Sequence, residues 1–498
     1  MKKIVVLFLL PLLLFGQPKN LTILHWNDFH SQNIPFQVKN RIKGTDTDTT
    51  FMVGGAGTLA AYVKKEKAAA ENVLVLDAGD EFQGTPISAI TKGRSQIELL
   101  KLTRPDAMEL GNHDFDYGRD LLSSYLKELP FDVLGGNMID KRTNKLFAPA
   151  YTVKEVGGIR VGVIGLMSME LHQLCLPDNI KDIELKELAA TVNGIVPELK
   201  KQKCDLIVAV THVGVQGDSL LALAAPDLDI IVGGHSHTPL FKPKRVNNVL
   251  IVQAGSRGRW LGKIAVTVDM EKDTVVKSYA ELIECRTADI TPDATVTTLV
   301  TKLEEQATKE LDEVIGQLKT DWKKEGYAES NLGNWITDAL RTYANADIAF
   351  QNSGGIRKEL LAGPIRVRDL WEISPFGNTL ATFTVDGATL RSMVQYQLSM
   401  KEESVQESGM KIVYKIVNGE RILHNLKVNN VPVQDSKRYT VVTNNFVVAQ
   451  SKKYFGVELP PSDVTLQTIT DREVLIDAVR KQKVITSVME GRIKETEE

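Results

Sequence analysis

Residues 73–80 read Val-Leu-Val-Leu-Asp-Ala-Gly-Asp, an apolar run that ends in two acidic residues around a glycine. A short apolar run rich in β-branched residues predicts a buried strand, and the acidic residues then fall just beyond its end. Residues 21–30 repeat the arrangement, with a strand pattern that ends in Asp-Phe-His. Further strands are predicted at residues 133–134, 159–166, 206–210, 230–232 and 249–252.

Helical patterns lie between several of these strands, at residues 59–70 and 185–201. Buried strands that alternate with helices predict an α/β layered domain. In such a domain, polar residues that follow the strand ends gather at one edge of the sheet, where ligands bind. The fold class therefore already predicts where the polar turns of this chain meet.

With 498 residues, the chain is too long for one compact core, so we expect two domains and a connector. Residues 293–316 read as one charged amphipathic helix, with Pro292 before it and Gly316 at its end. A second set of helix and strand patterns follows, which predicts a second α/β domain. The expected division is a first domain at 18–288, a linker helix at 289–318, a second domain at 319–490 and a polar tail at 491–498.

The first residues have the pattern of a signal peptide. Lys2 and Lys3 precede residues 4–15, which are apolar throughout apart from Pro11 and too few to span a bilayer as a helix. We expect processing near residues 16–18, hence a signal peptide at 1–17 and a mature protein secreted to the periplasm, without stable membrane insertion. The alternatives are an N-terminal membrane anchor and a first buried strand.

Charge and cysteine content exclude some classes of function. The chain has 60 basic and 63 acidic residues, a net charge of −3, so nothing favours a nucleic-acid polymer as partner. Cys175, Cys204 and Cys285 show no metal-binding spacing, and an odd number leaves at least one free thiol or an intermolecular pair. Cys204 opens an apolar run, which predicts a buried core residue.

Five of the eight histidines fall in short polar turns that end apolar runs of the first domain. The polar turns are Asp-Phe-His at 28–30, Asp-Ala-Gly-Asp at 77–80, Gly-Asn-His-Asp at 111–114, Thr-His at 211–212 and Gly-Gly-His-Ser-His at 233–237. Imidazole and carboxylate groups without thiols suit divalent ions such as zinc, manganese, magnesium, iron or cobalt. Each turn alone could be structural, but the ordered set predicts a metal site.

This ordered set resembles the 5′-nucleotidase family, which joins a calcineurin-like metallophosphoesterase domain to a substrate-binding domain. The resemblance continues through Ser-Asn-Leu-Gly-Asn at 330–334, Gln-Asn-Ser-Gly-Gly-Ile-Arg at 351–357 and Ser-Pro-Phe-Gly-Asn at 374–378. It covers nearly the whole chain after residue 17. It implies a four-layer β-sandwich flanked by helices, a linker helix and a second α/β domain that binds substrate.

The resemblance also implies two divalent metal ions, of zinc, manganese, cobalt or magnesium. The implied ligands are Asp28, His30, Asp80 and His237 for one ion, and Asp80 as a bridge with Asn112, His212 and His235 for the other. Two ions roughly 3.5–4 Å apart clamp the attacking and departing oxygens of a displacement at phosphorus. The implied nucleophile is water or hydroxide, without a covalent intermediate. Asp77 is expected to be structural.

The remaining implied roles are catalysis and substrate binding. His113 is implied to stabilise charge on the phosphate as the leaving oxygen departs, with Asp116 orienting its imidazole. Asn352 and Arg357 match a motif in which the arginine holds phosphate through its planar guanidinium. Phe376 and Phe446 match two aromatic residues that sandwich a nucleobase, although core packing is the alternative for both.

The sequence departs from the family pattern at two places. After Phe446 the family has a Gly-Gly-Asp-Gly stretch whose aspartate binds ribose, whereas here Lys452 stands at that position. A second arginine common before the 330–334 motif is absent, and Gly-Tyr-Ala at 326–328 occupies that region. A lysine in the ribose-binding position favours an anion, so these departures bear on the nucleoside preference and not on the phosphate chemistry.

The leading prediction is an exported two-metal phosphohydrolase that removes the 5′-phosphate of nucleoside monophosphates, with nucleotide-sugar pyrophosphates as a further substrate class. The alternatives on the same metal site are a 2′,3′-cyclic phosphodiesterase, another phosphomonoesterase or a sulfur-ester hydrolase. A non-catalytic binding protein is a third possibility, but it predicts loss of metal or catalytic positions, and every expected one is present.

Overall fold

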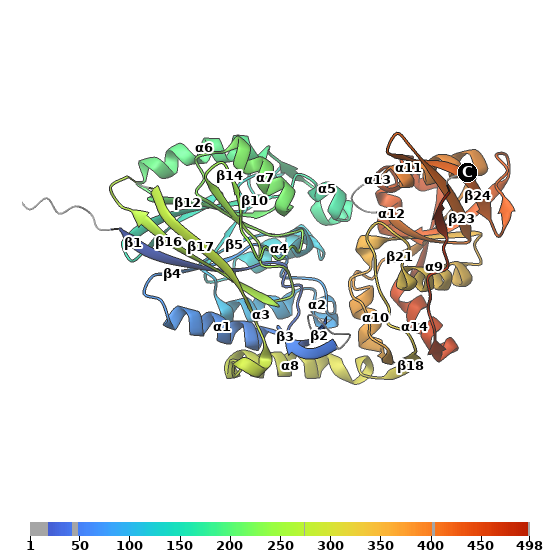
Figure 1. The fold of residues 1–498 in the computed structure, drawn as a ribbon, viewed down its shortest axis with the longest axis horizontal. Coiled ribbons are helices and arrows are strands. Elements are labelled where there is room, and N and C mark those ends of the chain that lie inside the picture. The colour runs from blue at the N-terminus through green and yellow to red at the C-terminus, as the bar shows by residue number, and fades with distance from the viewer. Residues whose placement is uncertain (1–17, 42–47, 273, 401–403, 497–498) are drawn as a thin grey trace, which may run out of the picture.

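The computed structural model describes residues 18–41, 48–272, 274–400 and 404–496. The predicted signal peptide at residues 1–17 lies outside the described residues. Two α/β bodies lie side by side, and helix α8 (Ala294–Leu311) runs along the base of the molecule from the first to the second (Figure 1). The expected arrangement of two α/β units joined by a helix is confirmed.

Two six-stranded sheets form the centre of the first domain. One has the order β17 (Thr274–Glu284), β16 (Trp260–Asp269), β1 (Lys19–Trp26), β4 (Val73–Asp77), β5 (Ala107–Glu109), β6 (Asp132–Leu134). The other has the order β14 (Lys244–Val246), β15 (Val249–Val252), β13 (Ile230–Gly233), β12 (Leu206–His212), β10 (Ile159–Met167), β9 (Tyr151–Val156). Strands β1, β4, β5 and β6 run parallel, as do β10, β12, β13 and β15.

Side chains from both sheets pack against each other in one apolar layer. Leu21, Leu74 and Ile264 from the first sheet meet Val161 and Val208 from the second, and all are buried. Helices α1 (Ala56–Ala68) and α3 (Arg94–Thr103) cover the outer face of one sheet, and α6 (Leu188–Lys201) and α7 (Gly214–Ala224) that of the other. The first domain is therefore a four-layer sandwich, as the resemblance implied.

Shorter elements complete the first domain. They are β2 (Phe36–Arg41), β3 (Asp48–Val53), α2 (Pro86–Thr91), the 3₁₀ helix η1 (Asn112–Phe115), α4 (Arg119–Leu126), β7 (Met138–Asp140), β8 (Lys145–Leu146), α5 (Leu171–Leu174), η2 (Pro177–Ile180), β11 (Ile183–Leu185) and η3 (Thr287–Asp289). The helix expected from residue 185 begins at Leu188, because Leu185 ends β11 and pairs with Met138.

The second domain has a five-stranded central sheet. Its order is β22 (Val405–Ser408), β19 (Ile348–Asn352), β26 (Arg438–Asn444), β21 (Thr379–Asp386), β27 (Val464–Thr470). Helices α9 (Asn331–Ala344), α10 (Val367–Ile373) and α14 (Asp471–Gln482) pack on one face, and α11 (Gly387–Ser399), α12 (Asn445–Ala449) and α13 (Ser451–Phe455) on the other. The remaining elements are η4 (Ser353–Gly355), η5 (Pro461–Asp463) and two small sheets, β20 (Gly363–Arg366)–β18 (Val314–Leu318)–β28 (Val484–Ile485) and β25 (Val431–Pro432)–β24 (Glu420–Val428)–β23 (Met410–Val417)–β29 (Ile493–Glu495).

Two boundary predictions were wrong for the same reason. The linker helix was expected to reach residue 316 within a linker at 289–318, but α8 ends at Leu311 and Val314–Leu318 is strand β18. Residues 491–498 were expected to be a polar tail, but Ile493–Glu495 forms β29 beside β23. In both cases the strand is formed by partners distant in sequence, which local patterns do not report.

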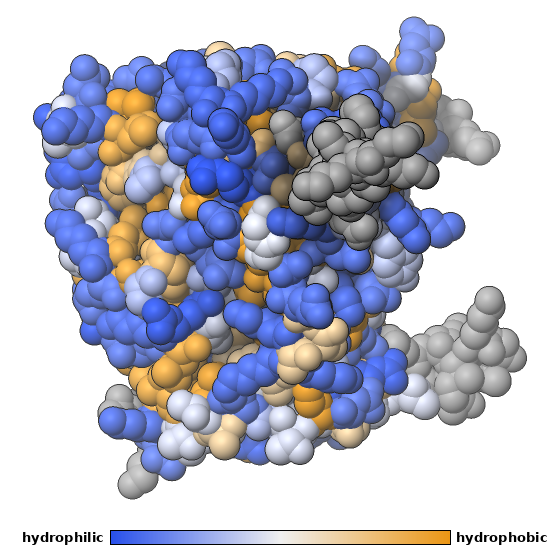
Figure 2. Space-filling model, turned by 90° about the vertical axis from the view of Figure 1, so that its left-hand side faces the viewer, coloured by the Kyte–Doolittle hydropathy of each residue, from blue (hydrophilic) through white to orange (hydrophobic). Residues whose placement is uncertain are grey.

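The outer end of the first domain is mostly polar, and the three cysteines are buried. The end of the first domain that faces away from the second is mostly hydrophilic, with apolar patches between charged side chains (Figure 2). Among the described residues, no helix combines the length and the apolar character needed to cross a bilayer. Cys175, Cys204 and Cys285 are buried free thiols, so the prediction of a buried Cys204 is confirmed.

Candidate active site

Four predicted ligands of the first ion converge beyond the ends of strands β1, β4 and β13. One donor atom from each of Asp28, His30, Asp80 and His237 lies within 4.8 Å of all the others. His237 Nε2 is 3.2 Å from Asp28 Oδ1 and 2.9 Å from His30 Nε2. His30 Nε2 is also 3.7 Å from Asp80 Oδ2. Side chains separated by about two hundred positions in the sequence thus share one small volume.

The remaining three predicted ligands come from the end of β12, the turn after β13 and the start of η1. His212 ends β12, and its Nε2 is 3.2 Å from Asp80 Oδ2. Its Nδ1 is 2.7 Å from the carbonyl oxygen of Ala78, a contact that keeps Nε2 directed at the cluster. The rings of His212 and His235 have centroids 5.1 Å apart. Asn112 begins η1, which follows β5.

The donor set fits divalent metal ions. Imidazole nitrogens and carboxylate oxygens face one another at short distances, which is unfavourable for lone pairs without a cation between them. Asn112 Oδ1 is buried and has no hydrogen-bond partner among the described residues. A buried amide oxygen without a donor needs another electrophilic partner, and a cation supplies one. Asp80 lies between the two groups of ligands, where a bridging carboxylate would stand.

The turns that carry these ligands have an unusual backbone. Asp28, His30, Asp80, His235 and His237 all have positive φ angles, of 51°, 51°, 62°, 76° and 52°. Asp and His are enriched in this left-handed region, yet each such residue costs on the order of 1 kcal/mol. Gly111 is required for space, because a Cβ there would lie 2.1 Å from Asp80 Oδ1.

Sequence reasoning gave Asp114 no role, yet its carboxylate organises the turn that carries Asp80. Its Oδ1 accepts hydrogen bonds from the backbone N–H groups of Glu81 and Phe82, at 3.0 and 3.1 Å. Its Oδ2 accepts from Gly111 and Asp80, at 2.8 and 3.2 Å. The signal was the acidic residue directly after His113, which could have been interpreted as a cap for a neighbouring turn.

His113 lies beside the cluster and is held by the predicted partner. Its Nδ1 is 2.9 Å from Asp116 Oδ2, and its backbone N–H donates to Asp80 Oδ1 at 2.8 Å. Burial lowers the pKa of His113, but the carboxylates of Asp116 and Asp80 raise it, and the net result is a pKa above its ordinary value. The imidazole therefore favours its protonated form, which can stabilise negative charge.

The carboxyl groups of the cluster favour their deprotonated, negatively charged form. Burial by itself raises the pKa of Asp80, but the imidazoles of His212 and His113 lower it well below its usual value. Burial likewise raises the pKa of Asp28, and His237 and His212 bring it below its usual value. Both carboxylates are therefore ionised, which is the form that binds metal.

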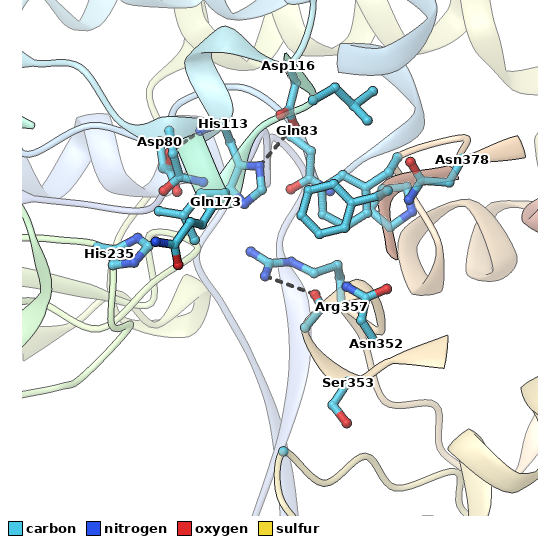
Figure 3. Close-up of a pocket in the computed structure, with 18 of the residues that line it drawn as sticks. Asp80, Gln83, His113, Asp116, Gln173, His235, Asn352, Ser353, Arg357 and Asn378 are labelled. Carbon is cyan, nitrogen blue, oxygen red and sulfur yellow. Dashed lines mark hydrogen bonds and ion pairs between the residues drawn. The ribbon is translucent and has the colours of Figure 1, made fainter. Parts of the chain in front are cut away.

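The second domain closes the other side of this cleft. A cavity of about 650 Å³ lies between the domains, with Asp80, His113 and His235 on one wall and Asn352, Arg357 and Phe376 on the other (Figure 3). The guanidinium of Arg357 points across the gap, and its Nη2 is 3.4 Å from His30 Nε2. A phosphate group next to the metal cluster would therefore also lie within reach of Arg357.

The two predicted aromatic residues both line this cavity. The Phe376 ring is 5.4 Å from the His113 ring and 5.8 Å from the Arg357 guanidinium carbon. Its turn is fixed by Arg472, whose Nη1 donates to the carbonyl oxygens of Ser374 and Pro375, both at 3.2 Å. Phe446 is half-buried, lines the cavity and also packs against the second-domain core.

Asn352 and the segment after Phe446, which departs from the family pattern, lie on the second-domain side of the cavity. Asn352 Oδ1 lies 3.1 Å from Gln351 Nε2, and its side chain faces the cavity beside Ser353. Lys452 is exposed and does not line the cavity, whereas its neighbour Lys453 does. Both lysines belong to α13 (Ser451–Phe455).

Comparisons with known proteins place these features in a class. Residues 21–239 match the family model for calcineurin-like phosphoesterases, and residues 314–457 match that for the 5′-nucleotidase C-terminal domain. The fold and the site together define a metal-dependent phosphoester hydrolase.

Two similar proteins identify the family within this class. The chain is 30% identical to a 5′-nucleotidase of Diplobatis ommata, over 96% of this chain and 90% of that one. The crystal structure of a 5′-nucleotidase precursor from Thermus thermophilus has a TM-score of 0.86 and 28% identity, and covers 96% of this chain and 100% of that chain. The chain therefore belongs to the 5′-nucleotidase family.

A third relative is a longer protein that is named as an endonuclease. Endonuclease YhcR of Bacillus subtilis (strain 168) is 31% identical over 95% of this chain, and the chain spans 41% of its length. The shared region includes both domains described above.

Proposed function

We propose that the protein is an exported two-metal phosphohydrolase that removes the 5′-phosphate of nucleoside monophosphates. Nucleotide sugars, cleaved at their pyrophosphate bonds, are the proposed further substrates. The proposed partners are therefore small molecules and not nucleic-acid polymers. The observation that carries the proposal is the cavity between the domains, in which the carboxylate and imidazole cluster faces Arg357 across the gap. A phosphate ester is the ligand that suits both walls.

The first-domain residues would have three roles. Asp28, His30, Asp80, Asn112, His212, His235 and His237 would hold two divalent ions. Such ions neutralise phosphate charge and lower the pKa of a water that attacks phosphorus. His113, kept protonated and oriented by Asp116, would stabilise the negative charge that develops as the leaving oxygen departs.

The second-domain residues would bind the substrate. Arg357 would hold phosphate oxygens through its planar guanidinium, with Asn352 beside it. Phe376 and Phe446 would contact a nucleobase through their ring faces, a mode that tolerates different bases. His113 and Phe376 are neighbours, so the base and the scissile phosphate would lie close to the domain interface.

We place the protein in the periplasm after removal of residues 1–17, with the first domain and the second domain, which includes β18 and β29, as its two functional parts. The charged start and the apolar residues 4–15 support export. A test is N-terminal sequencing of the mature protein recovered from the periplasmic fraction. Recovery of a chain that still begins at Met1 in the cytoplasm would contradict the proposal.

A substrate screen tests the activity. The purified protein is assayed with added manganese, zinc, cobalt or magnesium on AMP, UMP, UDP-glucose and p-nitrophenyl phosphate. We expect hydrolysis of AMP and UMP. If both remain intact while the aryl phosphate is cleaved, the nucleotidase assignment is wrong and the metal-dependent phosphatase activity stands.

A second candidate is a phosphodiesterase on the same metal cluster. The segment 446–454 lines the cavity with Phe446, Lys453 and Tyr454 and with no carboxylate, so the described residues of that segment offer no acidic acceptor for the ribose hydroxyls. The 31% identity to a protein named as an endonuclease favours the same direction. Cleavage of 2′,3′-cyclic AMP or bis(p-nitrophenyl) phosphate at a higher kcat/KM than AMP would select it.

A further inference from the structure

Three cationic side chains lie at or next to the cavity, and none of them is a predicted metal ligand. Arg357 and Lys324 both line the cavity. Arg257 reaches from the first domain, and its Nη2 donates a hydrogen bond to the backbone carbonyl oxygen of Arg357. The positive charges of Arg357 and Arg257 both lower the pKa of Lys324.

The ammonium group of Lys324 has no acidic partner of its own. The adjacent carboxylate of Glu359 is engaged elsewhere, since its Oε2 pairs with Lys323 Nζ at 3.1 Å and its Oε1 accepts from the Lys324 backbone N–H at 3.2 Å. Among the described residues, no hydrogen bond or ion pair of Lys324 Nζ is found. Lys324 thus presents an unpaired donor to the cavity.

The surroundings of Lys324 and Arg257 lower the pKa of both side chains. Burial, followed by the positive charges of Arg357 and Arg257, lowers the pKa of Lys324 to about 8, while Glu359 and Glu325 raise it. Burial and the charge of Arg357 likewise lower the pKa of Arg257 to about 10, with Glu372 opposing. Like charges held together in a partly desolvated site repel one another, and a bound anion removes that repulsion.

We propose that Lys324 binds the phosphate group of the substrate together with Arg357, and that Arg257 holds Arg357 in position from the first domain. This inference rests on the proposed phosphohydrolase activity. It assigns a second cationic contact on the substrate wall. It also makes the anion site depend on both domains, because Arg257 follows the first-domain strand β15 while Lys324 and Arg357 belong to the second.

The chain offers a matched control for Lys324. Lys323 precedes it and is likewise exposed, but it pairs with Glu359 and does not line the cavity. Replacing either lysine with methionine removes one positive charge and keeps most of the apolar stem. A general effect of charge on the protein would be the same for both variants, whereas direct binding of phosphate would affect only Lys324→Met.

The experiment compares wild type, Lys324→Met and Lys323→Met in the metal-loaded full-length protein. The steady-state hydrolysis of p-nitrophenyl phosphate and AMP is measured, together with inhibition by inorganic phosphate. We expect Lys324→Met to raise KM and the phosphate inhibition constant about tenfold with kcat changed less than about threefold. Lys323→Met should match wild type. Equal constants for Lys324→Met and Lys323→Met would overturn the proposal.

A pH profile separates binding from a merely structural role. Because the Lys324 ammonium loses its proton as pH rises through about 8, kcat/KM of the wild type should fall between pH 7 and 9. Lys324→Arg keeps its charge over this range, so its profile should be flatter, with a KM near wild type at pH 7. Identical profiles for wild type and Lys324→Arg would contradict the role given to Lys324.

The two substrates keep this test separate from the proposed nucleotidase function. If AMP is not cleaved but p-nitrophenyl phosphate is, the nucleotidase assignment fails while the KM and inhibition data still decide the role of Lys324. If Lys324→Met leaves phosphate inhibition unchanged while AMP is cleaved normally, the inference about Lys324 fails and the nucleotidase function stands.

Discussion

The two walls of the cleft are built in different ways. On the first-domain wall, five of the seven candidate ligands have left-handed backbones, and Asp114 fixes the Asp80 turn through four backbone N–H groups. On the second-domain wall, Asn352 has an ordinary φ of −61° and Phe446 lies within helix α12. One wall is locally strained and closely bonded, whereas none of the four candidate residues of the other wall has a positive φ angle.

This difference indicates where the protein tolerates change. Strained residues persist only where the surrounding structure over-determines them, and they concentrate at sites of chemistry. The first wall should therefore respond to substitution with loss of turnover. The second wall should respond with graded changes in affinity, because its candidate residues carry no such backbone strain.

Removal of metal should have the largest effect, because it removes the ions that the first wall is proposed to hold. Dialysis against EDTA is expected to reduce hydrolysis of every phosphate ester to background, and one of zinc, manganese, cobalt or magnesium should restore it. Elemental analysis of active, undialysed protein should find about two divalent ions per chain. Full activity in metal-free protein would mean that the cluster of Asp28, His30, Asp80 and His237 is not a catalytic metal centre.

Replacement of His113 with alanine should have the next largest effect. Because the imidazole stabilises charge only as the ester bond breaks, kcat is expected to fall about 10²–10⁴-fold. Metal content should stay near that of wild type. The control is Gln173→Ala, an exposed cavity-lining residue outside the proposed ligand set. Unchanged turnover in His113→Ala would remove this residue from the catalytic group.

Arg357→Lys should have a smaller effect, and on affinity rather than turnover. Lysine keeps the charge but loses the planar pair of donors, so KM for phosphate esters is expected to rise about tenfold with little change in kcat. The measurement is steady-state kinetics on AMP. A large fall in kcat with unchanged KM would show that the second wall takes part in the chemical step, and the contrast between the walls would be lost.

Phe376→Ala should have the smallest effect, and only for substrates with a base. Loss of one of two stacking faces is expected to cost about 1 kcal/mol, so KM for AMP should rise about fivefold while KM for glycerol phosphate stays constant. Parallel assays of the two substrates give the result. An equal rise for both would mean that Phe376 supports the cleft as a packing residue instead of contacting the base.

The sequence was most informative where chemistry and strand ends coincide. The ligand turns at 28–30, 77–80, 111–114, 211–212 and 233–237 could be placed together because parallel strands end at a common edge. The left-handed backbones of Asp28, His30, Asp80, His235 and His237 could not be predicted, since Asp and His adopt that conformation only under the constraint of neighbours. The hydrogen bonds of Asp114 likewise depend on turns that are distant from it in sequence.

The predictions failed where partners distant in sequence determine the outcome. Strands β18 and β29 exist because of β20, β28 and β23, so the expected helix end at 316 and the expected tail at 491–498 were wrong. Lys324 and Arg257 belong to no motif, and only the tertiary structure brings them near Arg357. A single charged residue in a sequence does not report which other charges surround it.

The position of β29 has a consequence for synthesis. The edge of β23 is covered by Ile493–Glu495, and β18 is paired with Val484–Ile485. Both small sheets of the second domain therefore need residues from 484–495, whereas the first domain has all of its strands by residue 284. The first domain can fold before those later residues are synthesised, and the second domain is complete only when they are available.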